Sequence, residues 1–209
     1  MKIKQKVNKL KEESEERNFT QSLDLVLNLK NIELDNPENR FSENLKLPNE
    51  VSEEVKICVI GDTLTKKVED DDVKLIGNDE LDEYAEDKKK AKELAQGIDF
   101  FIAEANLMAK IGKSLGPVLG PMNKMPQAMP PGEDPSGKIS DLKSSTSIKL
   151  GEKPIIQCKV GYQEMDDEKL EENIKTVVNF IKDKLPSGEH QIKNVMIKLT
   201  MSSPIELEV

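Results

Sequence analysis

Residues 111–131 read IGKSLGPVLGPMNKMPQAMPP, and this stretch decides how the rest of the chain is divided. It holds three glycines and five prolines in twenty-one residues, and two Gly-Pro steps bracket the apolar pair Val118-Leu119. Glycine adopts backbone angles that other residues avoid, whereas proline fixes its own φ and restricts the residue before it. We therefore predict a stiff, shaped and non-helical segment, for which the simplest interpretation is a connecting loop.

Upstream of this loop, short apolar runs alternate with polar stretches of helical character. The apolar runs are 55–61, 73–77 and 99–105, and the helical stretches are 63–70, 78–97 and 106–116. Short continuous apolar runs are typical of strands buried in a parallel sheet. Their alternation with helices predicts a Rossmann-like α/β domain with a parallel sheet, which we assign to residues 55–148.

The two ends of the chain show a different pattern. Helical spacing appears at 3–17 and 165–185, strand patterns appear at 23–29, 41–48, 153–161 and 192–201, and 134–150 fits a helix followed by the start of a strand. Leucines alternate with other residues from Leu23 to Leu29, as in a half-buried strand. The acidic segment 49–54 is expected to be a connector. We predict one discontinuous α+β domain, residues 1–54 and 149–209, interrupted by the α/β domain over 55–148.

The composition fits a folded protein with aliphatic cores. Hydrophobic residues make up 36% and charged residues 34% of the 209 residues, and an aromatic content of 3% leaves the core to aliphatic side chains. The formal net charge is −9: 13 Lys face 17 acidic residues in 55–148, and 18 Lys plus Arg face 23 acidic residues elsewhere. Nucleic-acid-binding proteins usually carry a basic excess, so charge alone argues against a strong RNA binder.

Few residues suggest catalysis or a cofactor. Cys58 and Cys158 lie in separate apolar runs without a second pair, which predicts buried free thiols of a reducing cytoplasm. The single histidine, His190, lies in a polar turn. Gly-Asp-Thr at 61–63 can bring amides near a phosphate but lacks the spacing of a dinucleotide site, and GKSLG at 112–116 lacks the upstream glycine of a P-loop. We expect no enzyme, no cofactor, no metal and no membrane-spanning segment.

Six short motifs follow one another along most of the chain. They are RNFTQS (17–22), NPENRF (36–41), DFFIAEANLM (99–108), LGPVLGP with KMP (115–121 and 124–126), VGYQEMDDEKLEENI (160–174) and KLTM (198–201). Their order resembles the archaeal form of the ribosomal protein L-one family, which belongs to the mobile stalk of the large ribosomal subunit. The resemblance implies the same interrupted architecture.

The resemblance also implies a function. A member of this family is a cytoplasmic, non-enzymatic constituent of the large subunit that binds stalk rRNA and helps discharged tRNA leave the exit site. A second implied role is translational repression by binding a stalk-like structure in its own mRNA. Outside the ribosome such a protein is expected to be a monomer.

Carried over motif by motif, a set of residues is expected to bind RNA. They are Arg17, Phe19, Gln21, Ser22, Lys153, Lys198, Thr200 and Met201. Hydroxyls and an amide can recognise 2′-OH groups and folded RNA shape, an aromatic ring can pack on a ribose or base, and cations can contact phosphate. From the residues alone, the simpler interpretation is that Phe19 belongs to the core and Thr200 is an ordinary strand residue.

Three departures from the family pattern remove cations or glycine. NEVSEE follows Leu47-Pro48 in place of a Gly-rich basic turn, Met122-Asn123 follows Gly120-Pro121 in place of basic residues, and Ser202-Ser203-Pro204 follows Met201 in place of Gly-Pro. Each lost cation should weaken phosphate affinity and flatten its salt dependence. Two hypotheses follow: a divergent but working stalk protein, or a non-ribosomal relative that acts as an interaction protein with weakened RNA binding.

Overall fold

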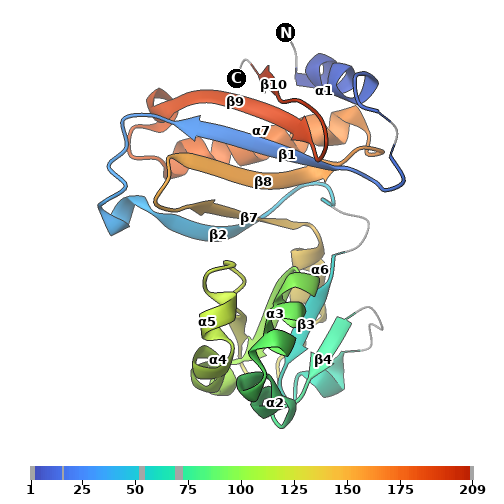
Figure 1. Ribbon diagram of the computed structural model, residues 1–209, viewed down its shortest axis with the longest axis vertical. Helices are drawn as coiled ribbons and strands as arrows, with labels where there is room; N and C mark the ends of the chain where they lie inside the picture. The colour runs from blue at the N-terminus through green and yellow to red at the C-terminus, as the bar shows by residue number, and fades with distance from the viewer. Residues whose placement is uncertain (1–2, 16, 52–54, 69–72, 208–209) are drawn as a thin grey trace. The chain divides into compact units, whose positions relative to one another are not determined.

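The computed structural model describes residues 3–15, 17–51, 55–68 and 73–207, apart from the side chains of residues 85 and 86. The chain forms two compact units, one from residues 1–53 with 143–209 and one from residues 54–142 (Figure 1). We call them the discontinuous unit and the inserted unit. In the described part of the chain, no helix is long and apolar enough to span a membrane.

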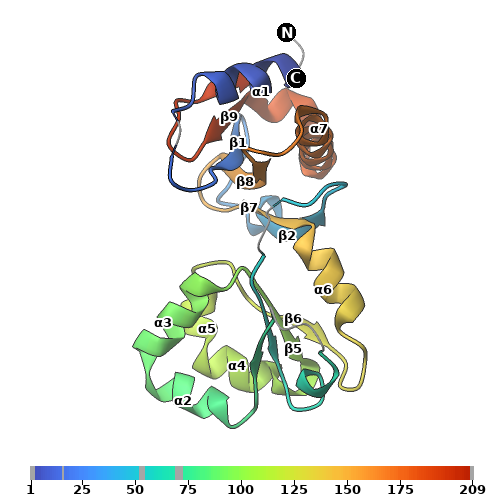
Figure 2. The same ribbon diagram turned by 90° about the vertical axis from the view of Figure 1, so that its right-hand side faces the viewer.

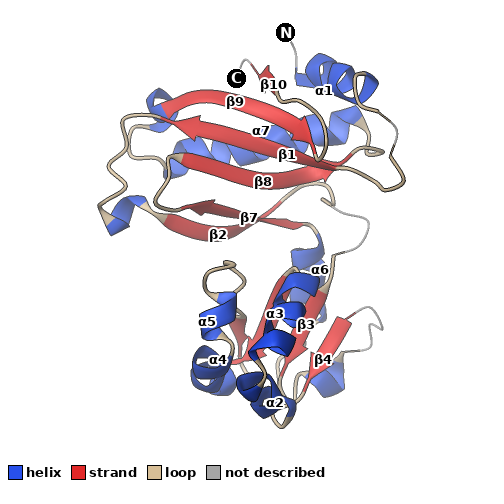
Figure 3. Cartoon of the chain, in the orientation of Figure 1, coloured by secondary structure: helices blue, strands red, loops and turns tan. Residues whose placement is uncertain are grey.

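The discontinuous unit has two layers, helices on one side and antiparallel strands on the other (Figure 3). Its elements are α1 (Ile3–Glu12), β1 (Ser22–Leu29), β2 (Phe41–Lys46), β7 (Ser145–Leu150), β8 (Ile155–Tyr162), α7 (Asp167–Lys184), β9 (Ile192–Leu199) and β10 (Ile205–Leu207). Four strands form one sheet in the order β10-β9-β1-β8, and β2 pairs with β7 in a second. Thus β1, from the N-terminal part, lies between two strands from the C-terminal part.

Alternation along β1 buries one face of this sheet. Leu23, Leu25 and Leu27 are fully buried and share a core with residues of α1 and α7. Figure 1 shows α7 behind the sheet, and Figure 2 shows α1 and α7 from the side. The alternating pattern correctly predicted this strand, because successive side chains point to opposite faces of a sheet.

The inserted unit is a parallel α/β unit. Its elements are β3 (Ile57–Ile60), β4 (Val73–Ile76), α2 (Glu80–Glu86), α3 (Lys88–Gly97), β5 (Phe100–Glu104), α4 (Met108–Ser114), α5 (Gly116–Leu119), β6 (Gln127–Met129) and α6 (Ser136–Lys143), whose last residue belongs to the other unit. The strand order is β4-β3-β5-β6, all parallel. Apolar clusters pack on both faces of this sheet, as the continuous apolar strands predicted.

The prediction of a non-helical segment over 111–131 is wrong in its first half. Helix α4 continues to Ser114, and α5 adds a helical turn over Gly116–Leu119. Pro117 stands in the first turn of α5, where proline's missing N–H costs no hydrogen bond. The helix up to Ser114 agrees with the helical stretch predicted over 106–116, whereas α5 and the short strand β6, Gln127–Met129, were not predicted.

Several predicted boundaries also change. The helix expected over 78–97 is broken at Asp87, whose carboxylate accepts the N–H groups of Lys89 and Lys90 and so caps α3. The first helix ends at Glu12 rather than near Arg17, and a short 3₁₀ turn over Thr65–Lys67 replaces the described part of the helix expected at 63–70. Residues 69 and 70 of that stretch, like 52–54 of the expected connector, lie outside the described residues.

The chain returns to the discontinuous unit at Lys143, before the expected boundary at residue 149. The reason is β7, which pairs with β2 over its whole length from Ser145 to Leu150. Strand β10 was not expected at all, because three residues are too few to show a period.

Both cysteines are buried free thiols, as the apolar runs predicted. Cys58 lies in β3 of the inserted unit and Cys158 in β8 of the discontinuous unit. Burial raises the pKa of each thiol to about 12. Each unit therefore contains one buried thiol that can report on its opening.

Candidate nucleic-acid interface

One end of the discontinuous sheet brings together residues from both chain ends. The Ser22 N–H donates to Thr200 Oγ1 at 3.2 Å, and the Thr200 N–H donates to the Ser22 carbonyl at 3.2 Å. The Thr200 oxygen thus accepts a bond from the backbone, while its own proton remains available to donate outward. Ser22 is half-buried and Thr200 is exposed. We call residues 17–22 and 199–203 the strand-end site.

Gln21 lies beneath this site and holds it in shape. Its side chain is buried, and its Nε2 donates to Ser14 Oγ at 2.8 Å and to Gln163 Oε1 at 3.2 Å. Its Oε1 accepts the Met201 N–H at 3.0 Å. A buried amide with both ends bonded has little capacity left for a ligand. Gln21, expected to touch RNA, therefore supports the residues that face outward.

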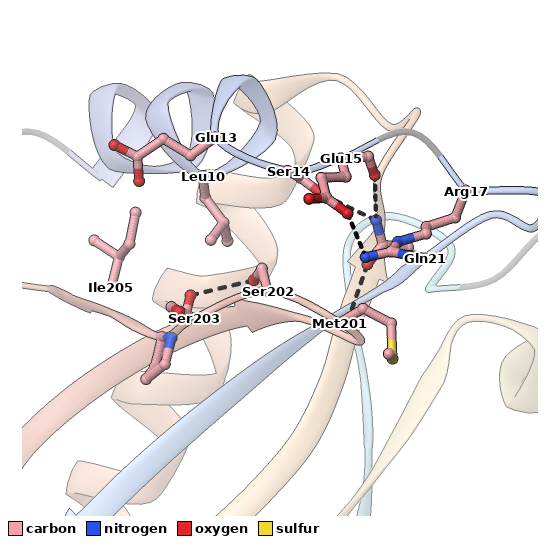
Figure 4. A pocket seen from close by; sticks show the side chains of 11 residues that line it. Leu10, Glu13, Ser14, Glu15, Arg17, Gln21, Met201, Ser202, Ser203 and Ile205 are labelled. Carbon is pink, nitrogen blue, oxygen red and sulfur yellow. Dashed lines mark hydrogen bonds and ion pairs between the residues drawn. The ribbon is translucent and has the colours of Figure 1, made fainter.

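A hollow of about 310 Å³ lies between α1 and the turn after β9 (Figure 4). Leu10, Ser14, Arg17 and Gln21 line it on one side, and residues 201–205 on the other. Arg17 Nη2 pairs with Glu15 Oε2 at 2.7 Å, and both side chains are exposed. An exposed ion pair is weak, so the Arg17 charge is only partly offset.

Ser202 fits the turn where the family pattern would place glycine. The Leu199 N–H donates to Ser202 Oγ at 2.9 Å, and the Ser202 N–H donates to the Leu199 carbonyl at 3.1 Å. Among the described residues, only Asn31 and Asn123 are non-glycines with positive φ, so Ser202 is not in the left-handed region. The turn is therefore unstrained, and its hydroxyl is occupied by the turn itself.

Two apolar side chains of the site face solvent. Phe19 is 52% exposed and Met201 is 62% exposed. The interpretation of Phe19 as a core residue is therefore excluded. Exposed side chains of this size are common singly. Here Met201 directly follows Thr200 and Phe19 is three residues before Ser22, and Ser22 and Thr200 are hydrogen-bonded to each other.

The two lysines expected at the site lie in different places. Lys198 is opposite Asp24 in the β1–β9 register, two residues before Thr200. Burial raises the pKa of the Asp24 carboxyl, while the charges of Lys198 and Lys159 oppose that rise. Lys153 precedes β8 at the other end of the sheet, where Pro154 accepts the Leu29 N–H. It is about 26 Å along the strands from Ser22, at about 3.3 Å per residue.

Comparison with known proteins gives the family. The Ribosomal protein L1p/L10e family model matches residues 10–203, which span both units. The chain belongs to this family. The sequence resemblance is thereby confirmed, and with it the combination of α/β and α+β architecture that the resemblance implied.

Relatives in several archaea match over nearly their full length. The large ribosomal subunit protein uL1 of Methanothermobacter thermautotrophicus is 40% identical over 208 residues, which cover 98% of either chain. That of Methanothermococcus thermolithotrophicus is 44% identical over 92% of this chain and 91% of its own. That of Pyrococcus abyssi is 42% identical over 99% of this chain and 95% of its own. The L1p/L10e family is one of ribosomal proteins, not of enzymes.

In this member of the L1p/L10e family, a carboxylate from β5 is hydrogen-bonded to the amides that follow β3 in the inserted unit. The N–H groups of Thr63 and Leu64, just after β3, donate to Glu104 Oε1 at 2.6 and 3.0 Å. Gly61 has a φ of +155°, and a Cβ there would lie 2.5 Å from the Glu104 side chain. Glu104 is buried at the end of β5. Its carboxylate holds the amides that the Gly-Asp-Thr motif was thought able to offer to a phosphate.

Sequence reasoning missed three contributors to the site. Gln163 and Ser14 bond to Gln21, and Asp24 lies between two lysines. The alternation of β1 could have revealed Asp24, because it lies on the same face as Ser22, two residues away. Gln163 carries no such signal, since its contact depends on the pairing of β1 with β8.

Proposed function

We propose that this chain is a structural protein of the large ribosomal subunit that binds the rRNA of the mobile stalk through the strand-end site. Membership of the L1p/L10e family supports the ribosomal assignment. The observation that carries the choice of surface is Phe19, a half-exposed aromatic ring in a chain with 3% aromatic residues. An exposed ring three residues before the bonded Ser22–Thr200 pair suits a surface that contacts a base or ribose.

Recognition at this site would depend more on shape and hydroxyl groups than on charge. The Thr200 hydroxyl can donate to a 2′-OH or phosphate oxygen, and Met201 offers an apolar, adaptable surface beside it. Arg17 is the cation of the site, and its Glu15 partner offsets part of its charge. The salt dependence of binding should therefore be shallow, because few counterions are released.

The wider role follows from the same proposal. On the ribosome, in the cytoplasm, the protein would move with the stalk and help discharged tRNA leave the exit site. A stalk-like structure in its own mRNA would compete for the same surface and allow translational repression. Competition between the rRNA fragment and the mRNA leader for the purified protein tests this second role.

The first test is binding to a stalk rRNA fragment across a salt series, for the wild type and for the variants Phe19→Ala and Thr200→Val. Each substitution removes one stacking or hydrogen-bonding contact to RNA, which costs about 1–3 kcal/mol of binding free energy, and Thr200→Val also removes the acceptor of the Ser22 N–H. Each dissociation constant should therefore rise by roughly 5- to 150-fold.

Leu75→Ala is the matched control, since Leu75 is also an exposed apolar residue, at 41%, but lies in the inserted unit. It should leave affinity unchanged. If Phe19→Ala and Thr200→Val fold normally and bind as tightly as the control, the strand-end site is not the RNA site. Binding no tighter than to an unrelated RNA would favour the non-ribosomal interaction protein.

A further inference from the structure

The face of the four-stranded sheet opposite α1 and α7 carries a row of charged and polar side chains. The outward positions, taken from the strand registers, are Ser22, Asp24, Val26 and Asn28 on β1, Ile155, Gln157, Lys159 and Tyr162 on β8, and Asn194, Met196 and Lys198 on β9. The core leucines of β1 are buried and share a core with α1 and α7. No described helix of this unit packs on this face, which we call the open face.

The row nearest the strand-end site is Lys159–Asp24–Lys198. The registers place Asp24 directly between the two lysines on its neighbouring strands. Directly opposite residues in antiparallel strands have Cβ atoms about 5 Å apart, close enough for the three charges to interact. The two ammonium groups flank a half-buried carboxylate, so the row has a net positive charge within a protein of net charge −9.

This row is continuous with the strand-end site. Lys198 is two residues from Thr200, and Asp24 is two residues from Ser22, which is about 7 Å along a strand. Beyond the row, Val26 and Met196 form a small apolar centre, and Asn28 Nδ2 donates to Asn194 Oδ1 at 2.7 Å. Lys153 lies just before the first residue of β8, at the end of the sheet away from the strand-end site. The open face therefore extends from Lys198 toward Lys153, the two lysines expected to bind RNA.

The chemistry of the open face selects one part of a nucleic acid. From Asp24 to Asn28, neither the outward residues nor their partners on β8 and β9 are aromatic, so bases have no ring to stack on there; the aromatic residue in this register is Tyr162, opposite Ser22 at the strand-end site. Ammonium groups bind phosphate oxygens, amides bind ribose hydroxyls, and Val26 with Met196 can pack on a sugar. Its length of about 20 Å spans several phosphates of one strand.

We propose that the open face carries the sugar–phosphate backbone of the RNA that binds at the strand-end site, with Lys159 and Lys198 contacting phosphate and Asp24 limiting their combined charge. This rests on the proposed function and assigns two residues, Lys159 and Asp24, that the family resemblance did not supply. Asp24 acts as a positioning residue, since its carboxylate attracts both ammonium groups and weakens their attraction for phosphate.

The test compares Lys159→Gln, Lys159→Arg and Asp24→Asn for binding to the stalk rRNA fragment across a salt series. Losing one phosphate contact should lower affinity several-fold and make the salt slope shallower by about 0.7–0.9. Lys159→Arg keeps the charge and should retain the wild-type slope. Asp24→Asn should raise affinity several-fold and make the slope steeper, because the lysine charge is no longer offset.

Lys175→Gln is the matched control, an exposed lysine on α7 that pairs with Glu171 away from the open face. It should change neither affinity nor slope. The proposal is overturned if Lys159→Gln and Asp24→Asn match this control while Phe19→Ala and Thr200→Val still weaken binding. If those last two variants also bind normally, the proposed strand-end site fails as well, so the two failures are distinguishable.

Discussion

The two units differ in whether the polar groups at their strand ends are bonded internally or exposed. In the inserted unit, the amides of Thr63 and Leu64 after β3 are bonded to Glu104. The carboxyl ends of parallel strands are where open α/β sheets usually bind ligands. In the discontinuous unit, the buried Gln21 binds the backbone from below and leaves Thr200 exposed. In the inserted unit the Glu104 carboxylate occupies the amides at the strand end. In the discontinuous unit the Gln21 amide bonds to the backbone and leaves the Thr200 side chain exposed.

The largest expected effect on stability comes from removing the Glu104 carboxylate from the strand ends of the inserted unit. Glu104→Ala leaves the N–H groups of Thr63 and Leu64 without their partner. The unsatisfied donor of the buried Leu64 costs about 1–3 kcal/mol, and the lost bond of the exposed Thr63 adds about 1 kcal/mol. The free energy of opening the inserted unit should fall by about 2–4 kcal/mol. Labelling of the Cys58 thiol by a disulfide reagent, with peptides separated by mass, should accelerate by roughly 30- to 700-fold.

Two controls test whether the effect of Glu104→Ala is local. Glu104→Gln keeps an acceptor in the same place and should accelerate Cys58 labelling much less. Labelling of Cys158, in the other unit, should not change with either variant. Equal acceleration of both thiols would mean that the two units open together and that Glu104 does not act locally.

A smaller effect on stability is expected from replacing Gln21 beneath the strand-end site. Gln21→Leu removes the acceptor for the Met201 N–H and the donor to Ser14 and Gln163. The discontinuous unit should lose about 1–3 kcal/mol of stability, seen as faster labelling of Cys158. Affinity for stalk RNA should also fall, although Gln21 itself is buried.

The matched control for this change is Gln96→Leu, an exposed glutamine of α3 in the inserted unit. It should leave Cys158 labelling and RNA affinity as in the wild type. Unchanged RNA affinity in a folded Gln21→Leu protein would show that the turn after β9 keeps its shape without the buried amide.

The smallest effect is a loss of stability with rising pH in both units. Each folded thiol has a pKa of about 12, above that of a thiol in the unfolded chain, so only the unfolded state loses its proton between pH 7 and 9. The stabilisation is fully present below the unfolded pKa and is lost as pH rises toward 12. Between pH 7 and 9, each thiol should cost about 0.4–0.8 kcal/mol.

Urea unfolding followed by circular dichroism at pH 7 and pH 9 checks this effect. Cys58→Ala should remove the part of the pH dependence that belongs to the inserted unit and leave the part due to Cys158. An identical pH dependence in wild type and Cys58→Ala would mean that other groups cause it.

The sequence predicted what depends on local periodicity. The alternating leucines of β1 and the helical spacing of α7 are each contained in one segment, and both elements formed where expected. The Gly-Pro segment was mispredicted because proline is compatible with the first turn of a helix, as at Pro117. Its composition indicates stiffness but does not indicate which conformation is held.

Contacts between distant segments were beyond sequence reasoning. Glu104 meets the amide of Thr63 across 41 residues, and Gln21 meets Met201 across 180. Such pairs are created by strand order, which no single segment encodes. The same limit separates Lys153 from Lys198: both were expected at one site, and antiparallel pairing places them toward opposite ends of the sheet.

The interrupted path of the chain has a consequence for its own synthesis. Strand β1 pairs only with β8 and β9, and about 130 residues, including the whole inserted unit, separate it from β8. At roughly 5–20 residues per second, those residues take on the order of 10 s to emerge. Throughout that interval the inserted unit has its strands in order and can fold, whereas β1 presents its leucines with both edges unpaired. The newborn protein is thus most open to aggregation in the unit that we propose to bind RNA, until its last sixty or so residues arrive.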